Sequence, residues 1–459
     1  MVNIISPINS LENHQTATTQ LVKKVYKRPG HHLIKSFCSP RPTHAMRHLM
    51  EFQDEILWFL LATFGVFVPL AATNKRLHTL AMNINASTMK NSLRLDFDKL
   101  PVCCIPGIML HPWMQFTTIL YSKYAILEAE TLQEITKHPW KKIIMWSQNS
   151  NHLQDWNTTQ LSNVNFWWQR PRNPQFLSFC SKNLQHLTLG HCALDTRELL
   201  RELVKYSTLK SLTLRDHKIT KQVCYQIGTL LSQLPLTCLN LDRTPVGDSG
   251  FKALIEHVPN LRELSISTIS RTPLTSVIHI GLTLRHLEKL DVSHNNITTG
   301  ASGQNLLMCL ALLYHLKSLN VAGNTIFPEA AVQFRYATES FRTTLRELNM
   351  GFMVQRTVSL DQTATDALCA MLTRMPLLET LNISGNNLDS SNFGSYVSCF
   401  TTLTKMTSLI LSHNNLKYKE VALLGDATKK LPKLKSMNLE YNKLAYPSIL
   451  HSCCFVWHA

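Results

Sequence analysis

The sequence predicts an α/β solenoid, a coil in which short strands and helices alternate and successive units stack. Three observations lead to this prediction. A phrase of eleven residues, LxxLxLxxNxL, recurs from Leu184 to Leu444, with starts 25 to 33 residues apart. Its apolar residues alternate as they do along a β-strand. Several copies are followed by apolar residues at helical spacing. One such unit cannot bury its own apolar face, so the units must stack.

The ninth position of the phrase divides the copies into two kinds. Copies that begin at Leu184, Leu209 and Leu236 replace the asparagine, and weaker copies begin at Leu261 and Leu345. The asparagine is present in five copies, as Asn295, Asn324, Asn386, Asn414 and Asn442. We expect the fourth and sixth positions to enter the core. The ninth amide should turn inward and bond to backbone groups that lose partners as the chain bends.

The second half of several units is predicted to be helical. Asp195 is a candidate N-cap for one helix, since its carboxylate can accept from the first free amides. Residues 247–250, Gly-Asp-Ser-Gly, are expected to form a turn before another helix. Each unit is therefore expected to contain one strand and one helix.

The repeated phrase resembles the leucine-rich repeat family. Units near 28 residues with a full helix are similar to its ribonuclease-inhibitor class. The resemblance implies a strongly curved horseshoe with a parallel sheet on the concave side and helices on the convex side. We assign residues 184–459 to regular repeats. Degenerate phrases at Phe116, Trp140 and Leu161 extend the repeats back over residues 90–183.

Residues 51–83 carry a different pattern, within a segment that we place at residues 46–85. An acidic start leads into an apolar helix, a break at Gly65 and a second helix that ends in a basic stretch. This resembles an F-box, although Phe52-Gln53 stand where that family has Leu-Pro and the middle is one residue short. The resemblance implies binding to a Skp-type adaptor, and through it to a cullin, by Ile56, Leu57, Leu60, Leu70 and Leu77.

Two alternatives remain for the same stretch. From Ile56 to Ala72 there are 17 residues without a charge, the lower limit for a membrane span. Gly65 and Pro69 would weaken so short a span, and we expect no membrane contact. The stretch would otherwise be an apolar helical cap on the first repeat.

Composition and charge indicate the character of the N-terminal tail, the state of the cysteines and the class of protein. Residues 1–45 are basic, with Glu12 as their one acid, and are predicted to be a disordered tail. The formal charge is +16, and the 12 cysteines include no CxxC pair. We therefore expect free thiols in a reducing compartment, the cytoplasm or alternatively the nucleus. No phosphate loop or catalytic motif is present, so we expect no enzyme, metal or cofactor.

The concave face is predicted from the repeat, because the third, fifth and seventh positions should point outward. The predicted partner-binding residues are His186, Thr188, Thr213, Arg215, Asn240, Asp242, Lys289, Asp291, Asn320, Asn349, Asn382, Asn438 and Glu440. The asparagines are expected to be partly structural, through contacts between neighbouring strands. No aromatic cluster is expected there, although Phe352 and Tyr441 at eighth positions could contribute. The excess positive charge lies mostly elsewhere, so we expect no nucleic acid on this face.

Together these patterns favour a protein-recognition module. The F-box resemblance implies a substrate-recruiting subunit of a cullin-type ubiquitin ligase, with a protein substrate on the concave face. The first alternative is a repeat scaffold or inhibitor unrelated to ubiquitin, with residues 51–83 as its cap. The second is a membrane-tethered repeat protein.

Overall fold

The computed structural model describes residues 93–96, 116–121, 141–145, 162–167, 182–190, 195–217, 219, 221–355, 358–444 and 454–456. The chain divides into two compact units, the first of Met1–Ser147 with His152–Leu161, and the second of Gln148–Asn151 with Ser162–Ala459. The predicted tail and the F-box-like segment lie outside the described residues, and so do Ile56, Leu57, Leu60, Leu70 and Leu77.

Three strands are described in the first unit. They are β1 (Leu93–Asp96), β2 (Phe116–Tyr121) and β3 (Lys142–Met145). β2 pairs in parallel with both β1 and β3. β2 and β3 coincide with the degenerate phrases at Phe116 and Trp140. The degenerate phrases therefore still mark strands that pair as in a repeat.

The second unit contains one short parallel strand for each copy of the phrase. The strands are β4 (Asn163–Trp167), β5 (His186–Gly190), β6 (Ser211–Arg215), β7 (Cys238–Asn240), β8 (Glu263–Ser265), β9 (Lys289–Asp291), β10 (Ser318–Asn320), β11 (Glu347–Asn349), β12 (Thr380–Asn382), β13 (Ser408–Ile410) and β14 (Ser436–Asn438). Equivalent positions stand opposite one another. Leu319, for example, pairs with Leu290 on one side and Leu348 on the other.

The last strand departs from the repeat. β15 (Cys454–Val456) pairs antiparallel with β14 and adds a strand that no copy of the phrase predicts. An unpaired edge of a sheet is open to pairing with another chain, and β15 occupies the edge that β14 would otherwise present.

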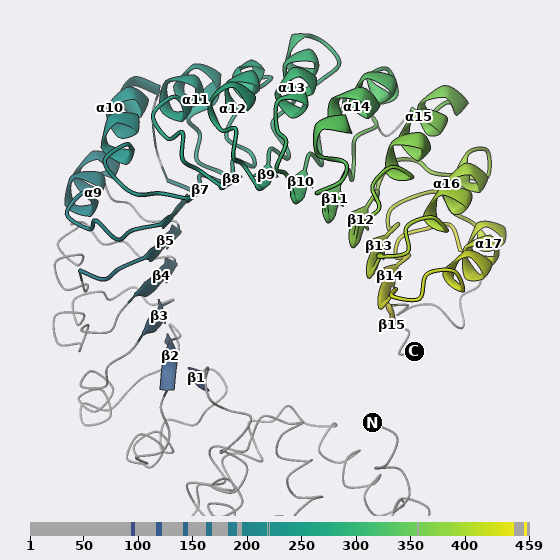
Figure 1. Ribbon diagram of the computed structural model, residues 1–459, viewed down its shortest axis with the longest axis horizontal. Helices are drawn as coiled ribbons and strands as arrows, with labels where there is room; N and C mark the ends of the chain where they lie inside the picture. Colours follow the sequence, from purple (N-terminus) through teal and green to yellow (C-terminus); the bar gives the residue numbers. More distant parts are fainter. Residues whose placement is uncertain are drawn as a thin grey trace, which may run out of the picture. The chain divides into compact units, whose positions relative to one another are not determined.

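Helices follow most strands of the second unit. They are α9 (Thr196–Leu203), α10 (Lys221–Leu231), α11 (Gly247–Ile255), η5 (Thr275–Val277), α12 (Ile278–Thr283), α13 (Ala301–Ala311), α14 (Ala331–Ala337), η6 (Thr338–Phe341), α15 (Gln362–Leu372), α16 (Phe393–Phe400) and α17 (Tyr418–Thr428). Figure 1 shows the strands of this unit along the inner side of an arc and the helices along its outer side. The predicted α/β solenoid is confirmed.

The predicted helix starts had mixed outcomes. Asp195 caps α9 as expected, since its carboxylate accepts from the backbone amides of Arg197 at 2.9 Å and Glu198 at 3.1 Å. The turn expected at residues 247–250 is instead the first turn of α11. Asp248 in that turn accepts from Thr275 Oγ1 at 2.6 Å, and so ties α11 to the following unit.

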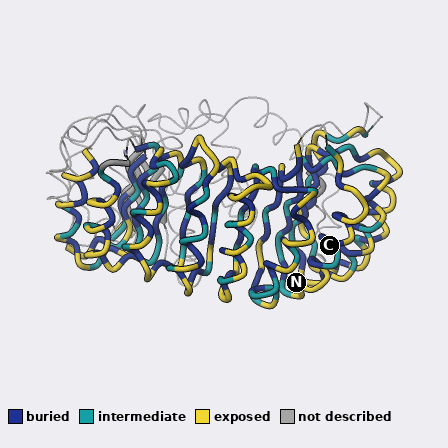
Figure 2. Tube along the Cα trace, turned by 90° about the horizontal axis from the view of Figure 1, so that it is seen from above, coloured by how far each residue is buried: buried dark blue, intermediate teal, exposed yellow. Residues whose placement is uncertain are grey.

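The core lies between the strands and the helices. Every fourth and sixth position of the ten copies is buried, as Leu381 and Ile383 illustrate, and Phe251 and Phe334 are fully buried from the helical side. Figure 2 shows buried segments recurring from one turn of the coil to the next. Fully burying one such side chain contributes about 1.5–3 kcal/mol, so the stacked rows supply the main stabilisation.

The ninth-position asparagines bind consecutive units together. Asn324 Nδ2 donates to Val321 O of its own unit at 2.9 Å and to Val292 O of the preceding unit at 3.0 Å. Its Oδ1 accepts from the amides of Asn295 at 3.1 Å and Ile297 at 3.2 Å, both in the preceding unit. We call this row the asparagine ladder, formed by Asn295, Asn324, Asn386, Asn414 and Asn442. The predicted inward amide is thus confirmed, with one or two bonds to its own unit and up to three to the unit before.

Candidate functional site

The inner face of the second unit forms a shallow groove of about 470 Å³ that spans strands β6 to β13. Of the predicted concave residues, the groove brings together Thr213, Asn240, Lys289, Asp291, Asn320, Asn349 and Asn382. His186, Thr188, Arg215, Asp242, Asn438 and Glu440 do not line it. Glu263 and Glu347 do, at third positions of their strands. The groove therefore crosses neighbouring units and belongs to no single one.

The fifth-position side chains are fixed by their own turns. In Asn240, Asn320, Asn349, Asn382 and Asn438, Oδ1 accepts from the backbone amide two residues further on, at 2.9–3.1 Å. Asp291 makes the same bond to Ser293. The expected contact between neighbouring strands occurs once among them, from Asn320 Nδ2 to Asp291 Oδ2 at 2.7 Å. Because the carbonyl oxygen is engaged, each amide is held in one orientation by its own turn. The Nδ2 atoms of Asn240, Asn320 and Asn438 also donate to carboxylates of the same face.

Seventh positions fall into two groups. Arg215 and Asp242 are half-buried and Glu440 is exposed, whereas Ser293, Ser384 and Ser412 are buried. The expectation that all seventh positions point outward is therefore wrong for the serines. Ser293 shows the cause, because its Oγ donates to Asp291 Oδ1 at 2.6 Å and turns back toward its own strand.

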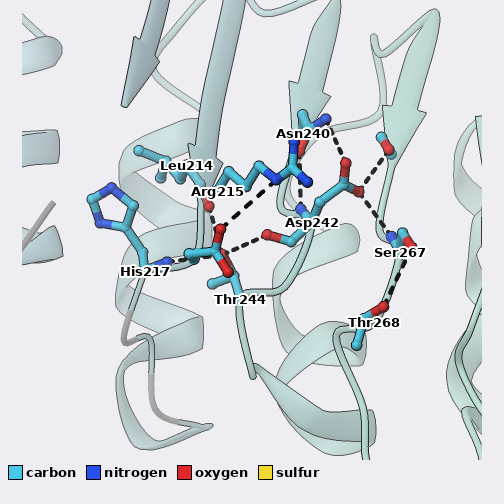
Figure 3. Close-up of polar contacts among 10 residues, drawn as sticks. Leu214, Arg215, His217, Asn240, Asp242, Thr244, Ser267 and Thr268 are labelled. Carbon is cyan, nitrogen blue, oxygen red and sulfur yellow. Dashed lines mark hydrogen bonds and ion pairs between the residues drawn. The ribbon is translucent and has the colours of Figure 1, made fainter. Parts of the chain in front are cut away.

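Figure 3 shows the polar contacts around Asp242 and Thr244. Asp242 accepts from Asn240 Nδ2 at 2.9 Å, Ser265 Oγ at 2.7 Å and the amide of Ser267 at 2.9 Å. Arg215 forms an ion pair of 3.7 Å with the adjacent Asp216. Asp242 thus connects two units, and a substitution there would disturb the fold as well as any partner.

A third-position ion pair crosses the groove. Lys289 Nζ lies 2.9 Å from Glu263 Oε1. The hydrogen bond to Glu263 raises the pKa of Lys289, and the negative charge of Glu347 adds to this effect. Glu347 itself accepts from Ser318 Oγ at 2.8 Å. The side chains of Lys289 and Glu347 are exposed, so they can exchange these partners for groups of a bound molecule.

The eighth position is left-handed in nine successive units, a feature that sequence reasoning missed. The residues are Asp216, Arg243, Thr268, His294, Gly323, Phe352, Gly385, His413 and Tyr441, with φ between +55° and +69°. Side chains at this position stand at the edge of the inner face. A left-handed backbone is costly for residues with a Cβ, so the turn geometry of the repeat imposes it.

Three aromatic side chains gather on that edge, and we call them the rim rings: Phe352, His413 and Tyr441. The rings of His413 and Tyr441 stack with centroids 4.3 Å apart and planes 11° apart. The ring centroids of Phe352 and His413 are 5.8 Å apart. Gly385 allows this arrangement, because a Cβ there would stand 2.2 Å from Phe352 Cδ1. The expectation of no aromatic cluster on this face is therefore corrected at its rim.

None of the His, Cys, Asp and Glu side chains that the structure describes form a cluster of three or more that could hold a metal ion. Burial raises the pKa of the Cys224 thiol to about 11 and that of Cys309 to about 12, which keeps both in the unreactive protonated form. None of the helices that the structure describes has the length and apolar character to cross a bilayer.

Residues 283–300 match a family model described as leucine-rich repeat. The second unit has the fold of a leucine-rich repeat solenoid, and the matched residues lie within it. Among solved structures, this solenoid is similar to an internalin (inlF) from Listeria monocytogenes, with 18% identity over 73% of this chain and 84% of the internalin and a TM-score of 0.39. It is also similar to TLR13 in a TLR13–ssRNA13 complex, with 17% identity over 80% of this chain and a TM-score of 0.39. The chain spans 56% of that TLR13 chain. No curated protein matches it significantly.

Proposed function

We propose that the second unit is a recognition module that holds a protein partner against its inner face. The groove across β6 to β13 is the observation that carries this proposal. Its fifth-position amides are pre-oriented by their own turns, so they can bond to a partner without first losing conformational freedom. A surface assembled from many strands suits a partner of protein size better than a small molecule.

We further propose that residues 46–85 deliver the bound partner to a cullin-type ubiquitin ligase through a Skp-type adaptor. The support for this step is the F-box resemblance of that segment, including the apolar pair Ile56 and Leu57. In this role the chain does not itself catalyse the formation of any covalent bond. It raises the effective concentration of the partner near the ligase. We also propose that the repeats belong to the ribonuclease-inhibitor class, because their units are near 28 residues long and contain a full helix.

The test uses the tagged full-length chain, from which captured proteins are identified. Replacing Ile56 and Leu57 by Asp should abolish capture of an adaptor and a cullin while leaving the repeats folded, because charges at an apolar contact are costly. The double change Lys289→Ala/Glu347→Ala should lose the groove partner and retain the adaptor. A matched control is Asp426→Ala/Lys429→Ala, which removes one charge of each sign from an exposed ion pair at α17.

Each outcome bears on a different part of the proposal. If no adaptor is captured by the wild-type chain, the ligase role is wrong and the repeat scaffold or inhibitor is favoured. If the Asp pair unfolds the repeats, residues 51–83 are a buried cap. Retention in membranes after alkaline washing would favour the tethered alternative. Equal losses from the groove and control variants would contradict recognition through the inner face.

A further inference from the structure

The inner face differs in charge from the rest of the chain. The whole sequence carries a formal charge of +16. At the outward and rim positions of the units from β6 to β14, six carboxylates stand against three cationic side chains. The carboxylates are Asp216, Asp242, Glu263, Asp291, Glu347 and Glu440, and the cations are Arg215, Arg243 and Lys289. This face is therefore acidic on a basic protein.

Ion pairing neutralises only part of this charge. Among the described residues, Glu263 pairs with Lys289 and Asp216 with Arg215. The other four carboxylates are held by neutral donors, at 2.6–3.3 Å: Asp242 by Ser265 and Ser267, Asp291 by Ser293 and Asn320, Glu347 by Ser318, and Glu440 by Asn438. Four negative charges thus remain on the face, with Arg243 as the one cation there outside an ion pair.

One of the rim rings belongs to the residue that follows the last of these carboxylates in the chain. Tyr441 follows Glu440 in the chain and is 74% exposed, and Phe352 is 41% exposed. His413 is exposed too, and its backbone amide donates to Glu440 O at 2.9 Å. Exposed rings that are already stacked and held by a fixed left-handed backbone present flat faces at a low entropy cost. An aromatic face beside a carboxylate attracts cations, because the ring quadrupole and the negative charge act together.

We propose that the partner of the inner face is a basic protein segment, one of whose Lys or Arg side chains lies against Tyr441 beside Glu440. Further cationic side chains of the segment would lie along Glu347, Asp291 and Asp242. This proposal rests on the recognition function proposed above and adds the chemistry of the partner. A basic segment would gain more from the four carboxylates than a neutral one, and a nucleic acid would be repelled by them.

The experiment measures direct binding of the purified full-length chain to three labelled probes. They are a peptide alternating Arg and Lys with Gly and Ser, the same peptide with Glu at the charged positions, and a single-stranded RNA of mixed sequence. The basic peptide should bind most tightly. Its affinity should fall at least about tenfold as salt rises from about 50 mM to about 500 mM, because exposed charges are screened.

Substitutions at the rim test the site itself. Tyr441→Ala should weaken the basic peptide about three- to fivefold, in keeping with an exposed cation–π contact, whereas Tyr441→Phe should bind normally. Glu440→Gln should weaken it by about the same factor. The control is Tyr418→Ala, which removes a tyrosine of similar exposure (75%) from the start of α17. Unfolding curves of all variants should coincide with that of the wild-type chain.

Failure of this inference can be told apart from failure of the recognition function. If the Lys289→Ala/Glu347→Ala chain loses its cellular partner but the basic peptide does not bind, recognition stands and the basic partner is wrong. Tighter binding of the acidic peptide or the RNA would overturn the inference as well. Equal losses from Tyr441→Ala and Tyr418→Ala would show that the peptide binds without using the rim.

Discussion

The repeats with an asparagine at the ninth position differ from those that begin at Leu209 and Leu236, where His217 and Thr244 take its place. In the asparagine ladder one side-chain amide donates to two or three carbonyls and accepts from up to two backbone amides. Thr244 has a single hydroxyl for this task. Its Oγ1 donates to Leu214 O at 2.5 Å and accepts from the amide of His217 at 3.3 Å. The threonine thus makes a reduced version of the same link (Figure 3).

Two further units sharpen the comparison because their ninth positions are apolar. The backbone amide of Ile269 donates to Asn295 Oδ1 at 3.0 Å, and that of Met353 donates to Asn386 Oδ1 at 2.8 Å. In each case the amide that would be unsatisfied is served by the asparagine of the following unit. The ninth residue therefore acts on the unit before it as much as on its own.

The largest expected effect follows from removing one member of the ladder. Asn386→Ala would strip hydrogen bonds from the backbone of Met350, Ile383 and Met353, all in the interior. We expect a loss of about 3 kcal/mol in the free energy of unfolding, measured by chemical denaturation. The control is Asn382→Ala, which loses one bond at the groove surface and should cost about 1 kcal/mol. Equal costs for the two variants would contradict the special role of the ninth position.

A smaller effect is expected where the link is already reduced. Thr244→Val keeps the shape of the side chain but removes the hydroxyl that joins Leu214 O to the amide of His217. We expect a loss of about 1–2 kcal/mol, with Thr244→Ser close to the wild-type chain. A serine variant as unstable as the valine variant would show that packing and not the hydroxyl matters there.

The smallest effect is expected for ion pairs between units that are exposed to solvent. Arg346 and Glu379 form an ion pair between neighbouring units, with side chains 51% and 41% exposed. A double-mutant cycle with alanine at both positions should give a coupling of about 0.5 kcal/mol or less, which falls further as salt is added. A coupling as large as the cost of Asn386→Ala would mean that surface charges hold the units together.

Sequence reasoning predicted the parts of the fold that repeat. The strand of each unit, the buried fourth and sixth positions and the inward asparagines all follow from the spacing of apolar residues. β15 was not predicted, because Cys454–Val456 carries no copy of the phrase. The glycines at residues 247 and 250 predict a turn before the helix, whereas these residues form the first turn of α11 itself.

The site was harder to predict than the fold. Third and fifth positions could be placed on the inner face by counting, but the bonds that orient Asn382 and its equivalents lie within their own turns. The contact among the rim rings joins residues of three units, and the left-handed eighth position brings it about. Residue types at that position range from Gly385 to Thr268, so composition gives no signal there. Counting eighth positions indicates Phe352 and Tyr441 as possible contributors, but it does not show that both rings contact His413.

The asparagine ladder makes the dependence between neighbouring units unequal. Each asparagine completes the backbone of the unit before it, so a unit depends on its successor more than on its predecessor. Trimming units from the C-terminal side should therefore leave the new last unit with bare amides, whereas trimming from the other side leaves the remaining ladder bonds almost unchanged. The same asymmetry would govern growth of the array by duplication. An extra unit placed after Leu388 without its own asparagine would leave the amides of Asn386 and Leu388 without the bonds that Asn414 now gives them, so we expect such an insertion to be less stable than one that carries an asparagine.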